Sequence, residues 1–348
     1  MNNILILDEE DLNFVWEVVQ QQQMVFHPLI APDGKFDFQK FFASKSKKPF
    51  ILFIDRNIFS SLLEFCAKGT LKSRAEMQKI GLIMAWAEMN DIAISAGFAV
   101  EERATQISSQ ENGLVELQKF LEIIDYYPMQ LWLDVAEGRV SEIAPIHYTG
   151  KPAKNIIANY ATGNDHYYMA VASLIHMVLL YRDDRLSPAE KMKIFIKWMM
   201  DNLLISEYLL TYAALLFTNQ DGVKAPRSAR SNNIDRVIDG CKNQAWDIAY
   251  LTNWSVWYAN TDEYAEEMLF ATNDILLKRI FISQNNPNHF NGVLYHVFSK
   301  KEYTDIAIYI EKLMENRVKP DFGDNPMSYF EKLIDAGKAK LSEFVLQK

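Results

Sequence analysis

The hydrophobic positions of this chain fall into two patterns. Five consecutive apolar residues, 50–54, follow Pro49 and end at Asp55, and such an uninterrupted run is typical of a strand buried on both faces. The residues after it, from Ile58 to Phe65, place apolar side chains at helical spacing. The pattern therefore predicts a strand that leads through Asp55 into a helix.

Strand and helix signals alternate further along the chain. A helix is predicted over 76–90, a short strand over 91–95, and a third strand over 268–272 before a helix over 275–281. This alternation is the signature of a parallel sheet with helical crossovers. A short strand over 4–7 and helices over 12–23, 36–42, 303–316 and from 325 onward are also predicted.

Between about residues 104 and 244 the periodicity changes to long helical patterns. The best-marked helix starts at Ser187-Pro188, where Glu190 lies three residues after the serine, as in a capping box with proline at the first helical position. We therefore expect the α/β class: a small parallel sheet flanked by helices, formed by 1–103 and 245–348. Residues 104–244 would form a mostly helical insertion, and the tail would be helical.

Composition narrows the class of protein. With 348 residues, 49% of them hydrophobic, the chain can bury a substantial core. A net charge of -9 argues against a protein that coats nucleic acid by its bulk charge, but it does not exclude a local basic groove. Cys66 and Cys241 lie outside any C-x-x-C pattern, so neither a disulfide framework nor a thiolate zinc site is indicated. No signal peptide or membrane-spanning run is evident, which predicts a cytoplasmic protein without a membrane partner.

Four carboxylates stand at the ends of predicted elements and are the main candidates for chemistry. Asp55, Glu101 and Asp274 come after predicted strands, and Asp247 stands at a predicted helix start. Crowded acids need a counter-ion, and one or two Mg²⁺ or Mn²⁺ ions bound through oxygen ligands are the usual solution. Two such ions, roughly 4 Å apart, can activate water and stabilise the leaving oxygen in phosphodiester cleavage.

The order of these motifs resembles the PIN domain, a family of metal-dependent ribonucleases built on a small parallel sheet with an acidic cluster at its C-terminal edge. Each motif stands at the end of a predicted element, as in the family. The resemblance covers about 50–103 and 245–281. The matching positions are Asp55 and Asn57 in D-x-N, Glu101 or its substitute Glu102, Asp247, and Thr272 with Asp274 in T-x-D.

The resemblance implies a hydrolase: an Mg²⁺- or Mn²⁺-dependent endoribonuclease with RNA as its substrate and an inhibitory or regulatory protein as a possible partner. This chain departs from the family in its much greater length and in its longer interval between the third and fourth acids. The implied catalytic and metal-binding residues are Asp55, Asp247 and Asp274, with Glu101 bound directly or through water, and Asn57 and Thr272 orienting ligands or phosphate.

Other interpretations stay open at this stage. Each acid alone is equally well explained as a helix cap or a surface charge. The same fold with a degenerate acidic site would be a catalytically inactive scaffold or protein-binding module, and an all-helical protein is a third hypothesis. The polar stretch that carries Lys224, Arg227, Arg230 and Arg236 is either a grip for a phosphate backbone or a solvated loop.

Overall fold

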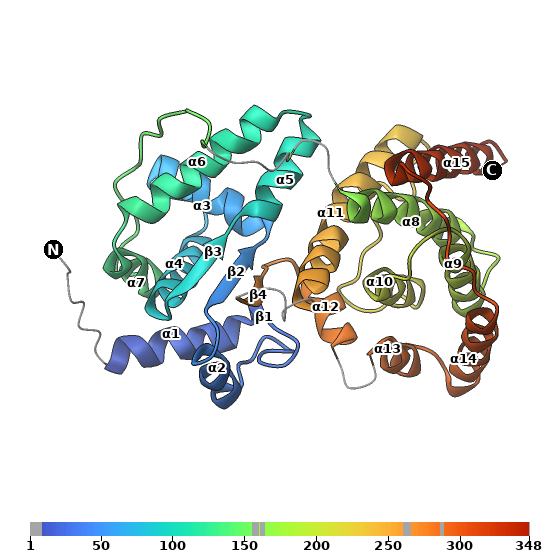
Figure 1. Ribbon diagram of the computed structural model, residues 1–348, viewed down its shortest axis with the longest axis horizontal. Coiled ribbons are helices and arrows are strands. Elements are labelled where there is room, and N and C mark those ends of the chain that lie inside the picture. The colour runs from blue at the N-terminus through green and yellow to red at the C-terminus, as the bar shows by residue number, and fades with distance from the viewer. Residues whose placement is uncertain (1–8, 155–159, 161–163, 260–265, 286–288, 348) are drawn as a thin grey trace. The chain divides into compact units, whose positions relative to one another are not determined.

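The computed structural model describes residues 9–154, 160, 164–259, 266–285 and 289–347, and the chain divides into two compact units (Figure 1). Unit 1 consists of Met1–Gly163 and Val256–Asn273, and unit 2 consists of Asn164–Ser255 and Asp274–Lys348. The chain therefore leaves unit 1 once, returns, and leaves it again. The sequence predicts a different division, into a domain formed by 1–103 and 245–348 and an insertion formed by 104–244, and this division stays a prediction.

Unit 1 contains the sheet, whose strand order is β1-β4-β2-β3 (Figure 1). The central strand β2 pairs in parallel with β3 on one side and with β4 on the other, which confirms the three predicted strands to within a residue. A fourth strand, β1, pairs antiparallel to β4, so the sheet is mixed rather than purely parallel. Two residues are too few to show a period, which is why the sequence pattern missed β1. The strands are β1 Val25–Phe26, β2 Phe50–Ile54, β3 Ile92–Ser95 and β4 Glu267–Ala271.

Helices surround the sheet of unit 1 (Figure 1). The core between them includes the fully buried Leu52 and Leu269 from the strands and Phe59 and Trp86 from the helices. The predicted strand over 4–7 lies outside the described residues. The helices are α1 Glu9–Gln22, α2 Phe38–Lys45, α3 Arg56–Lys68, α4 Arg74–Met89, α5 Gly97–Gln106, α6 Gln110–Tyr126 and α7 Met129–Glu137.

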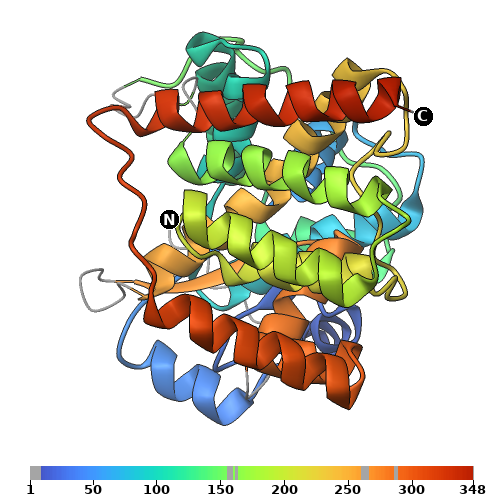
Figure 2. The same ribbon diagram turned by 90° about the vertical axis from the view of Figure 1, so that its right-hand side faces the viewer.

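Among the described residues of unit 2, the regular elements are all helices, joined by loops. The capping box at Ser187 is confirmed, because its side chain accepts from the Glu190 N–H and the Glu190 carboxylate accepts from the Ser187 N–H. Figure 2 shows α15 running alongside α8, against which it packs. The helices are α8 Asp165–Arg182, α9 Pro188–Asn202, α10 Glu207–Phe217, α11 Ile234–Ala259, α12 Ile275–Gln284, α13 His289–Val297, α14 Lys300–Glu315 and α15 Pro326–Leu346, with the last turn of α11 belonging to unit 1.

The expectation that Asp247 starts a helix is wrong. It lies in the middle of α11, which begins at Ile234. The first turns of α11 look polar in the sequence because their buried residues, Val237, Ile238, Gly240 and Cys241, stand among charged ones. That spacing still fits one helical face, but it is too sparse to mark a helix without knowledge of what covers it.

The length and hydrophobicity of the described helices can be compared with the prediction that the chain has no membrane-spanning segment. Among them, none combines the length and the apolar character that a bilayer crossing requires. The longest uniformly apolar helix, α8, is instead a core element of unit 2, with Ala170 and Leu174 buried inside the protein.

Candidate functional site

The carboxyl end of β2 is the point in the sheet where the strand order reverses. The chain passes from β2 to β3 on one side, and the strand β4, much later in the sequence, takes the place on the other side. In open α/β sheets, ligands bind in the crevice at such a switch point, outside the carboxyl ends of the strands. Asp55 is the residue directly after β2, so it stands at this position.

Asp55 is held on both of its carboxylate oxygens. Oδ1 accepts a hydrogen bond of 2.8 Å from the Ile58 N–H, so Asp55 is the N-cap of α3. Oδ2 accepts a hydrogen bond from the hydroxyl of Thr272. Asp55 is 1% exposed and Thr272 is fully buried. The helix-cap interpretation is confirmed, and the structure adds that two predicted site residues, 217 positions apart in the sequence, are in contact.

The backbone fixes Thr272 at this place. Its N–H donates to the carbonyl oxygen of Met24 at 2.9 Å, and the Asp55 N–H donates to the carbonyl oxygen of Ala271 at 3.0 Å. The pairing of β4 with β2 and the contact with the β1 segment therefore set the approach of hydroxyl to carboxylate. The register of this parallel pair, in which Ile54 is paired with Ala271, places the residues that follow the two strands side by side.

Asn273 is a further candidate residue, which the sequence motifs do not single out. Its Oδ1 is buried and has no hydrogen-bond partner among the described residues. Buried amide oxygens are almost always paired, so an orphan calls for an explanation such as a ligand, an ion or water. The signal was its place between Thr272 and Asp274 in the T-x-D motif, where the pattern assigns no role to the middle residue.

The middle residue of D-x-N also has a definite role. The guanidinium of Arg56 donates from its two terminal nitrogens to the carboxylate of Glu116, at 2.5 and 3.2 Å, and to the carbonyl oxygen of Ala99 at 3.2 Å. It therefore ties the start of α3 to α5 and α6. Asn57, by contrast, is exposed on the first turn of α3.

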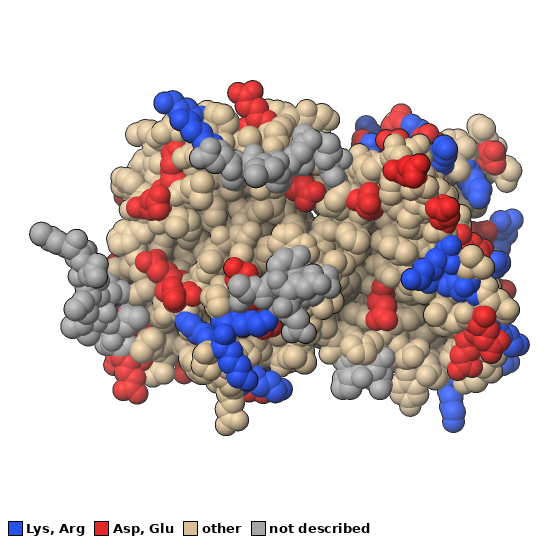
Figure 3. Space-filling model, in the orientation of Figure 1, with Lys and Arg blue, Asp and Glu red and all other residues tan. Residues whose placement is uncertain are grey.

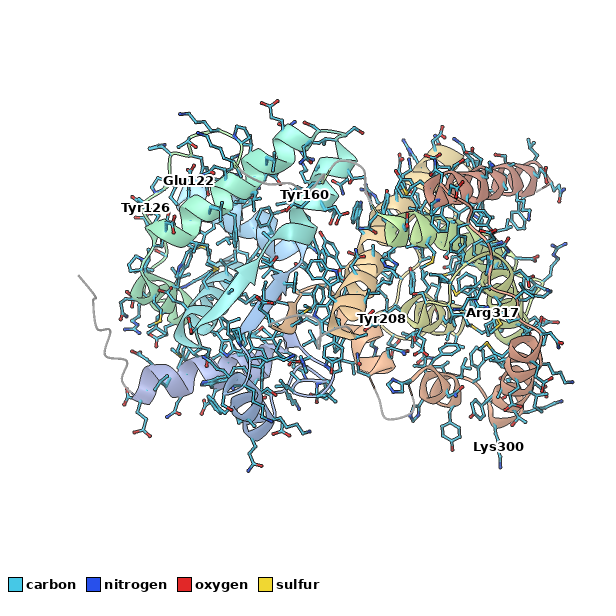
Figure 4. All side chains as sticks on the ribbon, viewed as in Figure 1. Glu122, Tyr126, Tyr160, Tyr208, Lys300 and Arg317 are labelled. Atoms are coloured by element: carbon cyan, nitrogen blue, oxygen red, sulfur yellow. The ribbon has the colours of Figure 1, made fainter. Side chains whose placement is uncertain are left out.

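Glu101 and Glu102 lie on α5 and not at the end of a strand. Glu102 accepts from the Gln106 side chain at 2.8 Å. Burial raises the pKa of Tyr160, and the negative charge of Glu101 raises it further. Tyr160 lies beside α5 and α6 (Figure 4), where Gln110 accepts from its N–H. Glu101 therefore lies within electrostatic range of this phenol.

Asp247 and Asp274 belong to unit 2. Asp274 is the N-cap of α12, with Oδ1 accepting from the Leu277 N–H at 2.9 Å, and Asp247 accepts from the Gln244 side chain. Burial is the main cause that raises the pKa of Tyr212, and the charges of both aspartates add to it. Both carboxylates therefore lie within electrostatic range of the same fully buried phenol.

The predicted site residues are thus brought together in part. Asp55 and Thr272 are in direct contact, and Asp247 and Asp274 share the surroundings of Tyr212. Over the described ranges of the chain, no three His, Cys, Asp or Glu side chains form a group that could hold a metal ion.

The predicted nucleic-acid contacts, Lys224, Arg227, Arg230 and Arg236, are all exposed in unit 2. Arg230 is already engaged: its Nη2 lies 3.3 Å from Asp184 Oδ1, and its guanidinium carbon lies 4.8 Å from the centroid of the Tyr181 ring. On the face of unit 2 that Figure 3 shows, positive and negative side chains are interspersed. The role of these cations in binding RNA stays a prediction.

Comparisons with known proteins add no family to this geometry. A scan of protein-family models finds no match to this chain, and searches of curated proteins and of solved structures find none. The PIN-like resemblance therefore stays a hypothesis that rests on the residues quoted for it.

The hydrogen bond between Thr272 and Asp55 should contribute measurably to the free energy of unfolding. We expect Thr272→Val to lower the free energy of unfolding by about 2 kcal/mol, because it deprives a buried carboxylate oxygen of this donor at nearly constant volume. Thr272→Ser keeps the hydroxyl and loses one methyl group, so it should cost less, about 1 kcal/mol. Urea denaturation measures both. Equal losses in the two variants would show that the hydroxyl contributes nothing.

Proposed function

We propose that this protein is a PIN-like, metal-dependent nuclease that cleaves RNA internally at the carboxyl end of β2. One observation supports the proposal most: the buried carboxylate of Asp55 stands where the strand order reverses and is oriented by the hydroxyl of Thr272. In open α/β sheets, ligands bind at such a switch point, so a carboxylate held there is placed to contact a ligand.

The oxygen atoms at this edge suit a hard divalent cation. Carboxylate and amide oxygens are the donors that Mg²⁺ and Mn²⁺ prefer, and the orphan Oδ1 of Asn273 is such a donor. The Asp55 carboxylate, which accepts hydrogen bonds from the Ile58 N–H and the Thr272 hydroxyl, is a second oxygen donor of this kind. A bound Mg²⁺ or Mn²⁺ would supply positive charge for the phosphate and a more acidic water.

Within this proposal the protein's own groups have separate tasks. Asp55 and Asn273 would hold the cation, and Thr272 would keep the Asp55 carboxylate in one orientation. Arg56 would fix the first turn of α3 through its bonds to α5 and α6. Glu101, Asp247 and Asp274 are further metal ligands that the family resemblance assigns, and they stay predictions.

The proposal is tested with labelled single-stranded RNA and the full chain in Mn²⁺ or Mg²⁺. We expect cleavage to fall on the order of 10²-fold in Asp55→Asn, because the cation that stabilises negative charge at the reacting phosphate would lose an anionic ligand. Asparagine caps helices as well as aspartate does, so the variant should stay folded. Mn²⁺ should also raise the melting temperature of the wild type and not that of Asp55→Asn.

Asp37→Asn is a matched control. Asp37 is the N-cap of α2, accepts from the Lys40 N–H at 3.1 Å and lies on the surface, so the same chemical change is made at a cap outside the site. It should cleave RNA like the wild type. Equal cleavage by the wild type and Asp55→Asn would reveal a contaminant and refute the proposal. Stabilisation by Mn²⁺ without any cleavage would favour the alternative, an inactive PIN-like binding module.

A further inference from the structure

Unit 2 contains a pocket of about 350 Å³ between α9, α10, α13 and α14. Its volume is in the lower part of the range in which proteins bind small molecules. Most of its described wall is apolar, and the walls on α9 and α10 are packed firmly, since Ile196 is 1% exposed and Leu210 is 4% exposed. The apolar lining residues are Ile196, Met200, Ile205, Leu210, Phe290, Ile310 and Met314.

The polar side of this pocket carries negative charge. Its described polar lining residues are Glu207, His289 and Asn291, and no lysine or arginine is among the described residues that line it. Arg317 lies beside α9 (Figure 4), but its guanidinium donates to the carbonyl oxygens of Met200 and Leu203. The one carboxylate in the lining therefore sets the preference of the pocket for a positive group.

Two buried polar side chains hold the Glu207 carboxylate in place. The Thr211 hydroxyl donates to Gln284 Oε1 at 2.8 Å, and Gln284 Nε2 donates to Glu207 Oε2. Thr211 is fully buried and Gln284 is 6% exposed. Burying an amide and a hydroxyl is costly unless both are paired, and here their hydrogen bonds end on the carboxylate at the pocket. Such supporting hydrogen bonds are typical of residues that must present a charge in one orientation.

We propose that this pocket binds a small organic cation, an amine with an apolar body, whose ammonium group pairs with Glu207 while the body lies against Met200, Leu210 and Met314. This site is separate from the proposed nuclease function and does not depend on it. Charge-assisted hydrogen bonds between an ammonium and a carboxylate are about twice as strong as neutral ones. Specificity comes from the carboxylate, and the apolar wall supplies affinity.

The test compares three probes of similar shape: 4-phenylbutylamine, 4-phenylbutan-1-ol and 4-phenylbutyrate. Isothermal titration of the full chain should show the amine binding about tenfold or more tightly than the alcohol, with the carboxylate weakest. In Glu207→Gln the preference for the amine should disappear. Glu207 is exposed, so this variant should fold, and circular dichroism checks that it does.

A second pair of variants separates pocket binding from surface attraction. Met314 is 49% exposed and lines the pocket, whereas Ile308 is 45% exposed on the same helix and does not line it. Met314→Trp should weaken the amine at least as much as Glu207→Gln does, and Ile308→Trp should bind it like the wild type. Equal binding of amine and alcohol, no effect of Glu207→Gln, or no binding of the amine at millimolar concentration would each overturn the proposal.

Discussion

Replacing Gly240 with alanine should lower the free energy of unfolding of unit 2 by about 3 kcal/mol. Gly240 is a buried residue inside α11, and a Cβ atom at this position would lie only 1.8 Å from the carbonyl oxygen of Arg227 and 2.8 Å from its carbonyl carbon. Alanine normally stabilises a helix interior by about 1 kcal/mol relative to glycine. Here the steric conflict with a backbone reverses that preference.

The segment that contains Arg227 cannot easily move away. Arg182 is 4% exposed, and its guanidinium donates to the carbonyl oxygens of Ala229 and Ser231. A shift of this segment to make room for a methyl group would therefore also break hydrogen bonds to a buried charge, which are costly to lose. The close approach of α11 to the segment requires a residue without a side chain at position 240.

The matched comparison is Gly337→Ala in α15. Its Cβ would meet a side-chain atom, Cγ2 of Ile175, at 2.6 Å. A side chain can rotate or shift more easily than a backbone, so we expect a loss of about 1 kcal/mol there. Urea denaturation of both variants provides the comparison. A Gly240→Ala variant as stable as the wild type would show that the Arg227 segment does not pack on α11 as described.

His176 on α8 should make the stability of the folded protein depend on pH. Its ring stacks on Trp198 with centroids 4.4 Å apart, and its Nε2 is buried without a hydrogen-bond partner among the described residues. Burial is the main cause that lowers the pKa of His176 to about 3, and the positive charge of Lys340 adds to it. The folded protein therefore keeps this imidazole neutral over the physiological range.

The sign of the effect follows from the lowered pKa. Below about pH 6.5 the unfolded chain takes up a proton at His176, whereas the folded chain does so only near pH 3. The contribution of His176 to the free energy of unfolding is therefore fully present above pH 6.5 and is lost progressively as the pH falls toward 3. Between pH 6.5 and about pH 5 the loss should be about 2 kcal/mol, since each unit of pH contributes about 1.4 kcal/mol.

His176→Phe isolates this contribution. Phenylalanine keeps an aromatic ring against Trp198 and cannot titrate, so carboxylate effects common to both proteins cancel in the difference. Urea denaturation over a pH series should show the wild type losing stability relative to His176→Phe as the medium is acidified. Parallel pH profiles of the two proteins would mean that His176 is protonated as readily in the folded state as in the unfolded chain.

The sequence by itself determined those elements of this protein whose burial pattern or helix cap is local. The sequence patterns place Asp55, Ser187 and Asp274 each at the start of a helix, and each side chain caps that helix in the structure. The buried strand over 50–54 was also predicted with its bounds. These features depend on interactions within a few residues, namely periodic burial and the hydrogen bonds of a first helical turn, so neighbouring residues are sufficient to specify them.

The tertiary structure alone decided how distant residues meet. The antiparallel strand β1 and the position of Asp247 inside α11 were not predictable, because each depends on a surface that another part of the chain provides. The contact of Asp55 with Thr272 joins residues separated by 217 positions. Such contacts are specified by strand order and packing, which bring together groups that no local pattern relates, and therefore only the folded chain shows which polar groups end up paired.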